Sequence, residues 1–436
     1  MPIERLTAAE AARLGGPAGA AEHIRSLVPR PADVEATVRE IVATVRAGGD
    51  EAVLDYTRRF DTAGGEVQPL LVSPAELDEA IKRLPLELVA ALQVTIANVA
   101  QVAQTGVSED VAVTLPQGHT IHVRELPVGS AAVYVPGGRA PYPSTVVMGV
   151  VTARAAGVLD VAVCSPPGRD GQLDASILGA CRLCGVGRVY RMGGAQAIAA
   201  LAYGTETVAR ADVVVGPGNL YVQEAKRLLS ATVGVDGFAG PSDLLVLLGA
   251  QATEEDVRFS ALDMLAQGEH GHGSLVVAVC THAGVAEMLA AELQGLLAEP
   301  PSVADSVFVL LEAADAGEAV AIANAFAPEH LQLIGEDVEV LARRIHSAGC
   351  AFVGASSATA FGDYVAGSNH VLPTGGTARF ASTLSPRHFR RRMAEVRIGP
   401  QPAGRLAKAG ALIARAEGFE WHARSMEARI GDNQPE

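Results

Sequence analysis

The chain has 436 residues, of which 49% are hydrophobic and 19% charged, and its formal net charge is −15. This apolar content excludes a disordered chain, and the length exceeds what one hydrophobic core usually supports, so we expect two or more domains. The acidic balance disfavours nucleic acid as a partner, because negative charge on the protein repels phosphate backbones. The basic run at residues 387–392 is too short to offset this charge.

The first residues carry charges at Glu4, Arg5, Glu10 and Arg13, so the apolar segment of a signal peptide cannot form there. No unbroken apolar stretch reaches the roughly 18 residues of a membrane span. We therefore expect a cytoplasmic protein without a membrane partner.

Five cysteines are an odd and sparse set for this length, which argues against a disulfide framework. Cys181 and Cys184 form a CxxC, a spacing that also occurs in zinc and redox motifs. No second CxxC accompanies it, and Ile177, Ala180 and Cys181 follow helical apolar spacing. Buried, reduced thiols are therefore expected.

Residues 1–60 have the apolar spacing of helices, and Ser73 marks the start of a further helix. A long helical stretch is predicted over 85–107, and residues 120–126 turn to the alternation of a β-strand. None of these segments carries a recognisable chemical motif.

From about residue 130 the pattern becomes a repeated strand, turn and helix. Such alternation is typical of a parallel sheet with helices on its faces. Ligands of such sheets bind at the carboxyl ends of the strands. Strands are predicted at 131–135, 160–164, 188–192 and 212–215, and helices begin near Ser144, Asp174, Ala195 and Asn219.

Three glycine-rich turns follow these strands, at 136–138, 193–194 and 216–218. None is a GxGxxG motif, and each by itself is explained as a tight βα connection. Together, with Gln196 after the second and Asn219 at a helix start after the third, they fit a dinucleotide whose phosphates bind backbone N–H groups. The residues alone indicate only a nucleotide-like ligand.

Residues 235–242 form a turn-rich linker, after which a second alternation begins. The two series predict an α/β fold with two Rossmann-like, doubly wound parallel-sheet domains of an incomplete Rossmann type, with a cleft between them. A helical N-terminal region and a C-terminal helical arm complete the prediction. The second series has strands at 243–248, 274–280, 306–312, 331–334 and 350–354, helices at 253–267, 283–298, 315–326 and 337–345, and arm helices at 385–393 and 402–429.

Gln267 and His270 lie at the end of a helix whose capped start is Thr253. Three residues apart, the two side chains point the same way and can begin a metal site, which needs at least four ligands for zinc. Asp363, in a Gly-bounded polar segment, and His422, near the C-terminus, are candidates for the others. A helix-end histidine with an ordinary hydrogen bond is the alternative.

Several motifs occur in a distinctive order along the chain. They are 265–271 (Leu-Ala-Gln-Gly-Glu-His-Gly), 327–331 (Ala-Pro-Glu-His-Leu), 362–373 and the pair Glu417 and His422, preceded by 134–138, 193–197 and 216–219. In this order and spacing they resemble the histidinol dehydrogenase family. The resemblance spans nearly the whole chain, and several unconnected motifs in one order are more specific than any one of them.

The resemblance implies a zinc- and NAD-dependent oxidation of L-histidinol to L-histidine through bound L-histidinal, the last steps of histidine biosynthesis. His330 would take the hydroxyl proton and Glu329 would activate water, while the substrate would chelate the metal through its two nitrogens. The residues implied for one zinc ion are Gln267, His270, Asp363 and His422. Those implied for NAD are Tyr134, Gln196 and Asn219. The substrate would contact Ser242, His330, His370 and Glu417 together with the four metal ligands.

The resemblance also implies a division of the chain into domains and a partner. An arm near the C-terminus would cross between the subunits of a homodimer, so that the active sites are shared. The expected domains are 1–24, a helical segment; 25–128 with 243–380, the substrate and metal domain; 129–242, the NAD domain; and 381–436, the exchanged arm.

Three other functions are weighed against this one. A related NAD-linked dehydrogenase of another small polar alcohol, such as a sulfonated diol, would lack the glutamate present here as Glu417. A metallohydrolase would use the same residue types around zinc, but it would not account for the glycine-rich turns. A non-catalytic nucleotide-binding protein would bind ligands without turnover.

Overall fold

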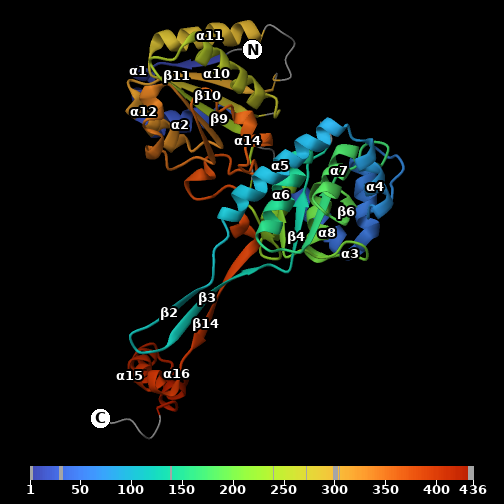
Figure 1. Cartoon of the computed structure of the whole chain (residues 1–436), viewed down its shortest axis with the longest axis vertical. Coiled ribbons are helices and arrows are strands. Elements are labelled where there is room, and N and C mark those ends of the chain that lie inside the picture. Colours follow the sequence, from blue (N-terminus) through green and yellow to red (C-terminus); the bar gives the residue numbers. More distant parts are fainter. Residues whose placement is uncertain are drawn as a thin grey trace.

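The computed structural model describes residues 3–28, 33–137, 140–238, 240–271, 273–297, 303 and 305–430. Two parallel sheets, each with helices on both faces, form the body of the molecule, and a three-stranded antiparallel sheet leads away from them to the C-terminal helices (Figure 1). The predicted α/β fold with two doubly wound sheets is confirmed.

The five-stranded sheet is built by the first alternation and has the strand order β6-β5-β4-β7-β8, with all neighbours parallel. Its central strands are buried apolar runs, the pattern of sheets that are covered on both faces. Helices α3, α8 and α9 cover one face, and α4 to α7 cover the other. The bounds are β4 Ser130–Tyr134, β5 Asp160–Ser165, β6 Arg188–Arg191, β7 Val213–Val215, β8 Gly234–Val235, α3 Glu35–Phe60, α4 Pro74–Arg83, α5 Leu86–Thr105, α6 Pro143–Ala155, α7 Ala175–Leu183, α8 Gly194–Tyr203 and α9 Leu220–Leu229.

The six-stranded sheet is built mainly by the second alternation and has the parallel order β1-β11-β10-β9-β12-β13. Helices α10 and α11 cover one face, and α1, α2, α12 and α13 cover the other. α10 begins where the sequence predicts, because Thr253 and Asp256 form a capping box. The bounds are β1 Ile3–Leu6, β9 Asp243–Leu248, β10 Leu275–Cys280, β11 Val307–Glu312, β12 His330–Ile334, β13 Cys350–Val353, α1 Ala8–Arg13, α2 Gly16–Ser26, α10 Glu254–Gly268, α11 Ala283–Leu296, α12 Ala316–Phe326, α13 Glu336–Glu339 and α14 Thr359–Tyr364.

Two expected groupings of the chain differ from the structure. Residues 3–6 form the edge strand β1, parallel to β11, so the N-terminal segment is part of the six-stranded sheet. Helices α3, α4 and α5, which the sequence assigns with 243–380, pack on the five-stranded sheet instead. Helical spacing shows which face of a helix is apolar, whereas the sheet that this face covers depends on long-range contacts that spacing does not contain.

The helix predicted at 385–393 is wrong. A short 3-10 turn, Pro386–Phe389, leads into strand β14, which pairs antiparallel with β3. Arg392 faces Glu125 across this ladder and binds its carboxylate. Pairing with a partner strand thus overrides the helical propensity of an arginine-rich run. The bounds in this part are β2 Val111–Thr114, β3 Thr120–Pro127, β14 Arg390–Arg397, α15 Pro400–Ala416 and α16 Glu420–Glu427.

One described helix, α5, is long and apolar enough to cross a membrane by length and composition alone. Its Leu92 and Val99 are buried in the core that α5 shares with α6 and the five-stranded sheet. Leu86, Val94 and Val102 of the same helix are exposed, so α5 packs on the five-stranded domain along one side only.

The cysteines are free, and Cys164, Cys181 and Cys280 are buried. Burial raises the pKa of the Cys181 thiol. The prediction of buried thiols for the CxxC is therefore confirmed at Cys181, while Cys184 is partly exposed.

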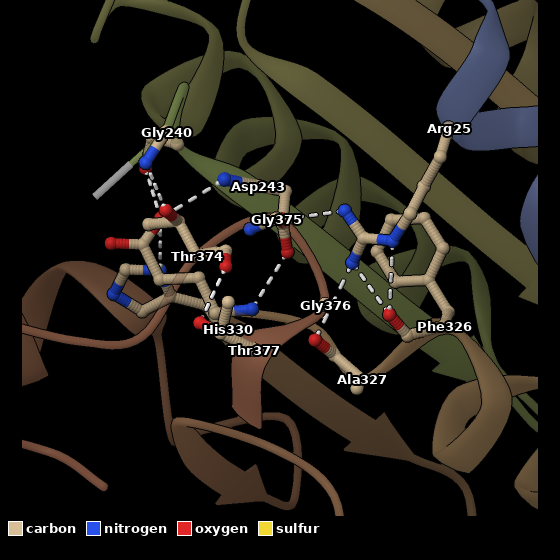
Figure 2. A network of polar contacts seen from close by, with 12 residues as sticks. Arg25, Gly240, Asp243, Phe326, Ala327, His330, Thr374, Gly375, Gly376 and Thr377 are labelled. Carbon is tan, nitrogen blue, oxygen red and sulfur yellow. Dashed lines mark hydrogen bonds and ion pairs between the residues drawn. The ribbon is translucent and has the colours of Figure 1, made fainter. Parts of the chain in front are cut away.

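A partly buried ion pair joins helix α2 to the start of β9 (Figure 2). The Arg25 guanidinium lies 3.3 Å from Asp243 Oδ2 and donates to the carbonyl oxygens of Phe326 and Ala327 at 2.5 and 3.4 Å. The same guanidinium covers the Phe326 ring, 3.9 Å from its centroid. Asp243 is 2% exposed and accepts the backbone N–H of Glu329 at 2.6 Å. The pair therefore fixes the backbone that enters β12.

We expect Arg25→Met to destabilise the protein by about 3 kcal/mol, because the buried Asp243 carboxylate is then left without its charged partner. Burial raises the pKa of Asp243, and Arg25 is the charge that opposes this shift. Guanidinium-induced unfolding measures the change. Arg39→Met is the control, since its exposed pair with Glu35 is worth at most about 1 kcal/mol. Equal effects of the two substitutions would contradict the role given to the buried pair.

Candidate functional site

Three elements of the six-stranded domain bring the predicted catalytic and metal-binding side chains together. Gln267 and His270 lie at the end of α10, His330 begins β12, and Asp363 lies on α14. β9 and β12 both begin here and run parallel. The site thus lies at the amino ends of these strands, not at the carboxyl ends where ligands of α/β sheets usually bind.

Glu329 is the centre of a buried hydrogen-bond network. Its Oε2 accepts from Ser242 Oγ at 2.5 Å and from the Asp243 N–H at 3.0 Å. Ser242 Oγ in turn accepts from Gln267 Nε2 at 2.5 Å, so the amide oxygen of Gln267 is the atom available to a ligand. Burial raises the pKa of Glu329 to about 7, although His330 and the two hydrogen bonds lower it. The carboxyl group can therefore exchange a proton near neutral pH.

His330 is buried between two carboxylates. Its Nε2 lies 3.3 Å from Asp363 Oδ1, and its Nδ1 lies 3.8 Å from Glu329 Oε2 without a hydrogen bond to any described residue. Burial lowers the pKa of His330, but the hydrogen bond to Asp363 and the charges of Glu329 and Asp363 raise it, to about 9 on balance. A ring in these surroundings holds a proton firmly once it has accepted one.

Gln267, His270 and Asp363 bring an amide oxygen, an imidazole and a carboxylate to the same region. His270 Nε2 lies 3.9 Å from Asp363 Oδ2, and the His270 side chain is 43% exposed. These donors suit a borderline divalent cation such as zinc. The part of the chain that the structure describes has no group of three or more His, Cys, Asp or Glu side chains that could hold a metal.

The segment around α14 is fixed by the other domain. His370 Nδ1 donates to the carbonyl oxygen of Asp363 at 2.8 Å, and its Nε2 lies 3.1 Å from Thr145 Oγ1 in the first turn of α6. Burial lowers the pKa of His370, which favours a neutral ring that accepts from the Thr145 hydroxyl. Asn98 on α5 donates to the carbonyl oxygen of Val365 at 2.7 Å. Asp363 consequently lies where the two domains meet.

Two of the predicted cofactor residues lie at the carboxyl end of the five-stranded sheet. Tyr134 ends β4, and its hydroxyl accepts the Gly194 N–H at 3.2 Å. Gly194 has φ 61°, a left-handed conformation that favours glycine. Gln196, in the first turn of α8, is 1% exposed, and neither atom of its amide has a hydrogen-bond partner among the described residues. A buried amide in this state at a helix N-terminus fits a ligand that both donates and accepts.

The third predicted cofactor residue, Asn219, caps α9 and is exposed. Side-chain contacts fix the turn before Asn219. Buried Lys226 donates to the carbonyl oxygen of Gly216 and pairs with Asp236 at 2.7 Å. Asp236 also accepts the Gly216 N–H at 2.7 Å. Both backbone polar groups of Gly216 are therefore held by buried side chains. Gly138, in the first predicted turn, lies outside the described residues.

The last two predicted residues are not brought to this site within one chain. Glu417 is the C-cap of α15 and His422 lies on α16, at the far end of the arm (Figure 1). The His422 ring packs against Phe419, with centroids 5.2 Å apart. The prediction that His422 joins the other metal ligands therefore requires a second copy of the chain.

Sequence reasoning missed three buried groups beside the predicted residues. Asp243 and Thr145 hold Glu329 and His370, respectively, and no local pattern marks either of them. Asp61, at the end of α3, has a buried carboxylate oxygen without a hydrogen-bond partner among the described residues. Burial raises its pKa to about 7. An aspartate next to an apolar helical run gives no sequence signal of this kind.

A family model described as histidinol dehydrogenase matches residues 28–430. Histidinol dehydrogenases of Synechococcus sp. and Prochlorococcus marinus are 40% and 41% identical to the chain, over 91% of its length and 92% and 90% of theirs. The crystal structure of histidinol dehydrogenase from Elizabethkingia anophelis is similar with a TM-score of 0.90 and 29% identity, and 98% of each chain is covered. An acetylating aldehyde dehydrogenase from Geobacillus thermoglucosidasius, with a TM-score of 0.50 and 13% identity, shares the fold alone. The chain belongs to the histidinol dehydrogenase family.

Proposed function

We propose that the protein oxidises L-histidinol to L-histidine through bound L-histidinal, in two steps that each reduce one NAD, at the end of histidine biosynthesis. The observation that carries the proposal is a buried imidazole, His330, between the carboxylates of Glu329 and Asp363. Family membership supports the same reaction, since relatives that are 40% identical over 91% of the chain are histidinol dehydrogenases.

His330 is the base for the substrate's hydroxyl group. Its Nδ1 is buried and has no hydrogen-bond partner among the described residues, so it can accept the hydroxyl proton. Asp363 stabilises the protonated ring. While Asp363 holds a cation, it would stabilise the protonated ring less, so the neutral ring would be populated at a lower pH.

Glu329 is the base for water in the second step. Water adds to the aldehyde carbon and loses a proton to the carboxylate, which gives the hydrate anion; loss of hydride from this anion in the second oxidation yields the carboxylic acid. A pKa of about 7 suits this task, because the carboxylate is then available near neutral pH and still basic enough to accept a proton. Ser242 and the Asp243 N–H hold one carboxylate oxygen in place.

Gln267, His270 and Asp363 would hold one divalent cation per subunit, for which zinc is the choice that fits these donors, with His422 as the fourth protein ligand. When bound, the cation orients the substrate's imidazole and amine and neutralises charge. Ser242 fixes the Gln267 amide so that its oxygen can serve as a ligand.

Tyr134, Gln196 and Asn219 would bind NAD, which accepts the hydride when bound. The N-termini of α8 and α9 both follow glycine-rich turns and offer backbone N–H groups to its phosphates. The contact between His370 and Thr145 joins α6, which follows β4 and Tyr134, to the segment that carries Asp363. A nicotinamide and a substrate can thus meet between the domains.

Glu417 and His422 would reach the site from the arm of a second copy in a homodimer. The arm exposes apolar side chains that a partner surface would cover: Leu412 is 63% exposed, Ile413 61% and Trp421 78%. Glu417 would then face the substrate's amine, beside Ser242 and His370. Such an enzyme with a small polar substrate belongs in the cytoplasm.

The alternatives differ from this proposal in what they produce. A metallohydrolase forms no NADH, and a dehydrogenase of a sulfonated diol has no use for a carboxylate at position 417, which is Glu417 here. NADH formation from L-histidinol, compared with NADH formation from other small alcohols, separates the three.

We expect His330→Asn to lower kcat by roughly 10²- to 10⁴-fold, the usual contribution of a general base, while substrate binding persists. NADH formation and calorimetric binding of L-histidinol measure the two effects. His346→Asn, at an exposed histidine of the same domain, is the control and should leave kcat unchanged. Unchanged turnover in His330→Asn would show that another group is the base.

Co-expression of two inactive variants tests arm exchange. A heterodimer of His330→Asn and His422→Ala subunits, purified through two different tags, should have about half of the wild-type activity, because exchanged arms leave one of its two sites intact. Each variant homodimer should be inactive. An inactive heterodimer would show that each arm serves its own subunit.

A further inference from the structure

One buried polar cluster joins the three elements that carry the catalytic and metal-binding residues. Gln332 on β12 is 0% exposed, and its Nε2 donates to Asp263 Oδ2 on α10 at 2.6 Å. The same nitrogen donates to the carbonyl oxygen of Ser357 at 3.3 Å, and Ser357 immediately precedes the N-cap of α14. A single side chain thus links α10, β12 and the start of α14.

Gln332 and Asp263 each lie on the same face of their strand or helix as a residue of the candidate site. Gln332 follows His330 by two positions, so both side chains point to the same face of the six-stranded sheet. Asp263 precedes Gln267 by four positions, so both lie on the same face of α10. A shift of α10 along β12 would therefore move Gln267 relative to His330 and break the link between Asp263 and Gln332 at the same time.

Burying these polar groups contributes less to the stability of the fold than apolar side chains would. Burial raises the pKa of Asp263 to about 6, although Gln332 lowers it, and Gln332 Oε1 has no hydrogen-bond partner among the described residues. Elsewhere α10 and this face of the sheet meet through apolar side chains such as Met264 and Ile334. Apolar residues of similar size would fill the space at lower cost. Stability alone therefore gives no reason for a polar link at this place.

On the basis of the proposed function, we infer that Asp263 and Gln332 are positioning residues for the metal site. They fix the register of α10 against β12 and the start of α14, and so they set the spacing of Gln267, His270 and Asp363 that one cation requires. They act through the elements that they join.

The test compares zinc affinity with stability in four variants. Asp263→Leu and Gln332→Met each remove the link, the double variant replaces it by an apolar pair, and Asp263→Asn keeps an acceptor for Gln332. Competition with a chromophoric zinc chelator gives the affinity, and guanidinium-induced unfolding of the metal-free protein gives the stability. Glu255→Gln, at an exposed position of α10, is the matched control.

We expect each single break to weaken zinc binding by roughly tenfold or more, the scale of effect known for groups that orient metal ligands. The double variant should recover the stability of the wild type while its zinc affinity stays low. Asp263→Asn should bind zinc nearly as tightly as the wild type. The double variant keeps the test decisive if a single variant does not fold.

Two other results are distinguishable. A double variant that binds zinc as tightly as the wild type would overturn the positioning role and leave the proposed function standing. A wild-type protein that does not compete for zinc would overturn the proposed metal site, and the positioning role with it.

Discussion

The proposed chemistry of this protein depends on one imidazole that is buried between two carboxylates. His330 is 2% exposed, and Asp363 and Glu329 flank its two nitrogens. Burial by itself would favour a neutral ring, so the proton affinity of His330 is set by how much negative charge the two neighbours direct at it. A ligand bound to Asp363 would change that charge, so in the proposed function cation binding would be linked to the proton affinity of His330.

The rest of the fold serves to hold these three groups in place. Asp243, paired with Arg25, accepts the N–H of Glu329 and so fixes the backbone before His330. Contacts from α5 and α6 of the other domain fix the segment that carries Asp363. The carboxyl end of the five-stranded sheet, where Tyr134 and Gln196 lie, is thereby joined to the amino end of β12. In the proposed function, substrate oxidation and cofactor binding would lie on different sheets and meet at their boundary.

The sequence predicts the local elements of this fold well and their grouping less well. Most strands and helices of both alternations lie within a few residues of their predicted bounds, because buried parallel strands and capped helices leave strong local patterns. The helix predicted at 337–345 is an exception, since α13 ends at Glu339 and a 3-10 turn follows at Ala342–Arg344. The placement of α3 to α5 and the pairing of β14 with β3 depend on contacts between distant residues, which no window of sequence contains. The edge strand β1 is too short to show a period.

The candidate site shows the same division. Gln267, His270, His330 and Asp363 come together as predicted, since short motifs carry them, whereas Asp243, Asp263 and Gln332 support them from positions that only packing reveals.

Diffraction at the zinc absorption edge, from crystals grown with zinc and L-histidinol, tests the central claim most directly. We expect one anomalous peak per subunit, bounded by Gln267, His270 and Asp363 of one chain and His422 of a second copy. A peak that lies away from His270 and Asp363, or none at all, would contradict the account.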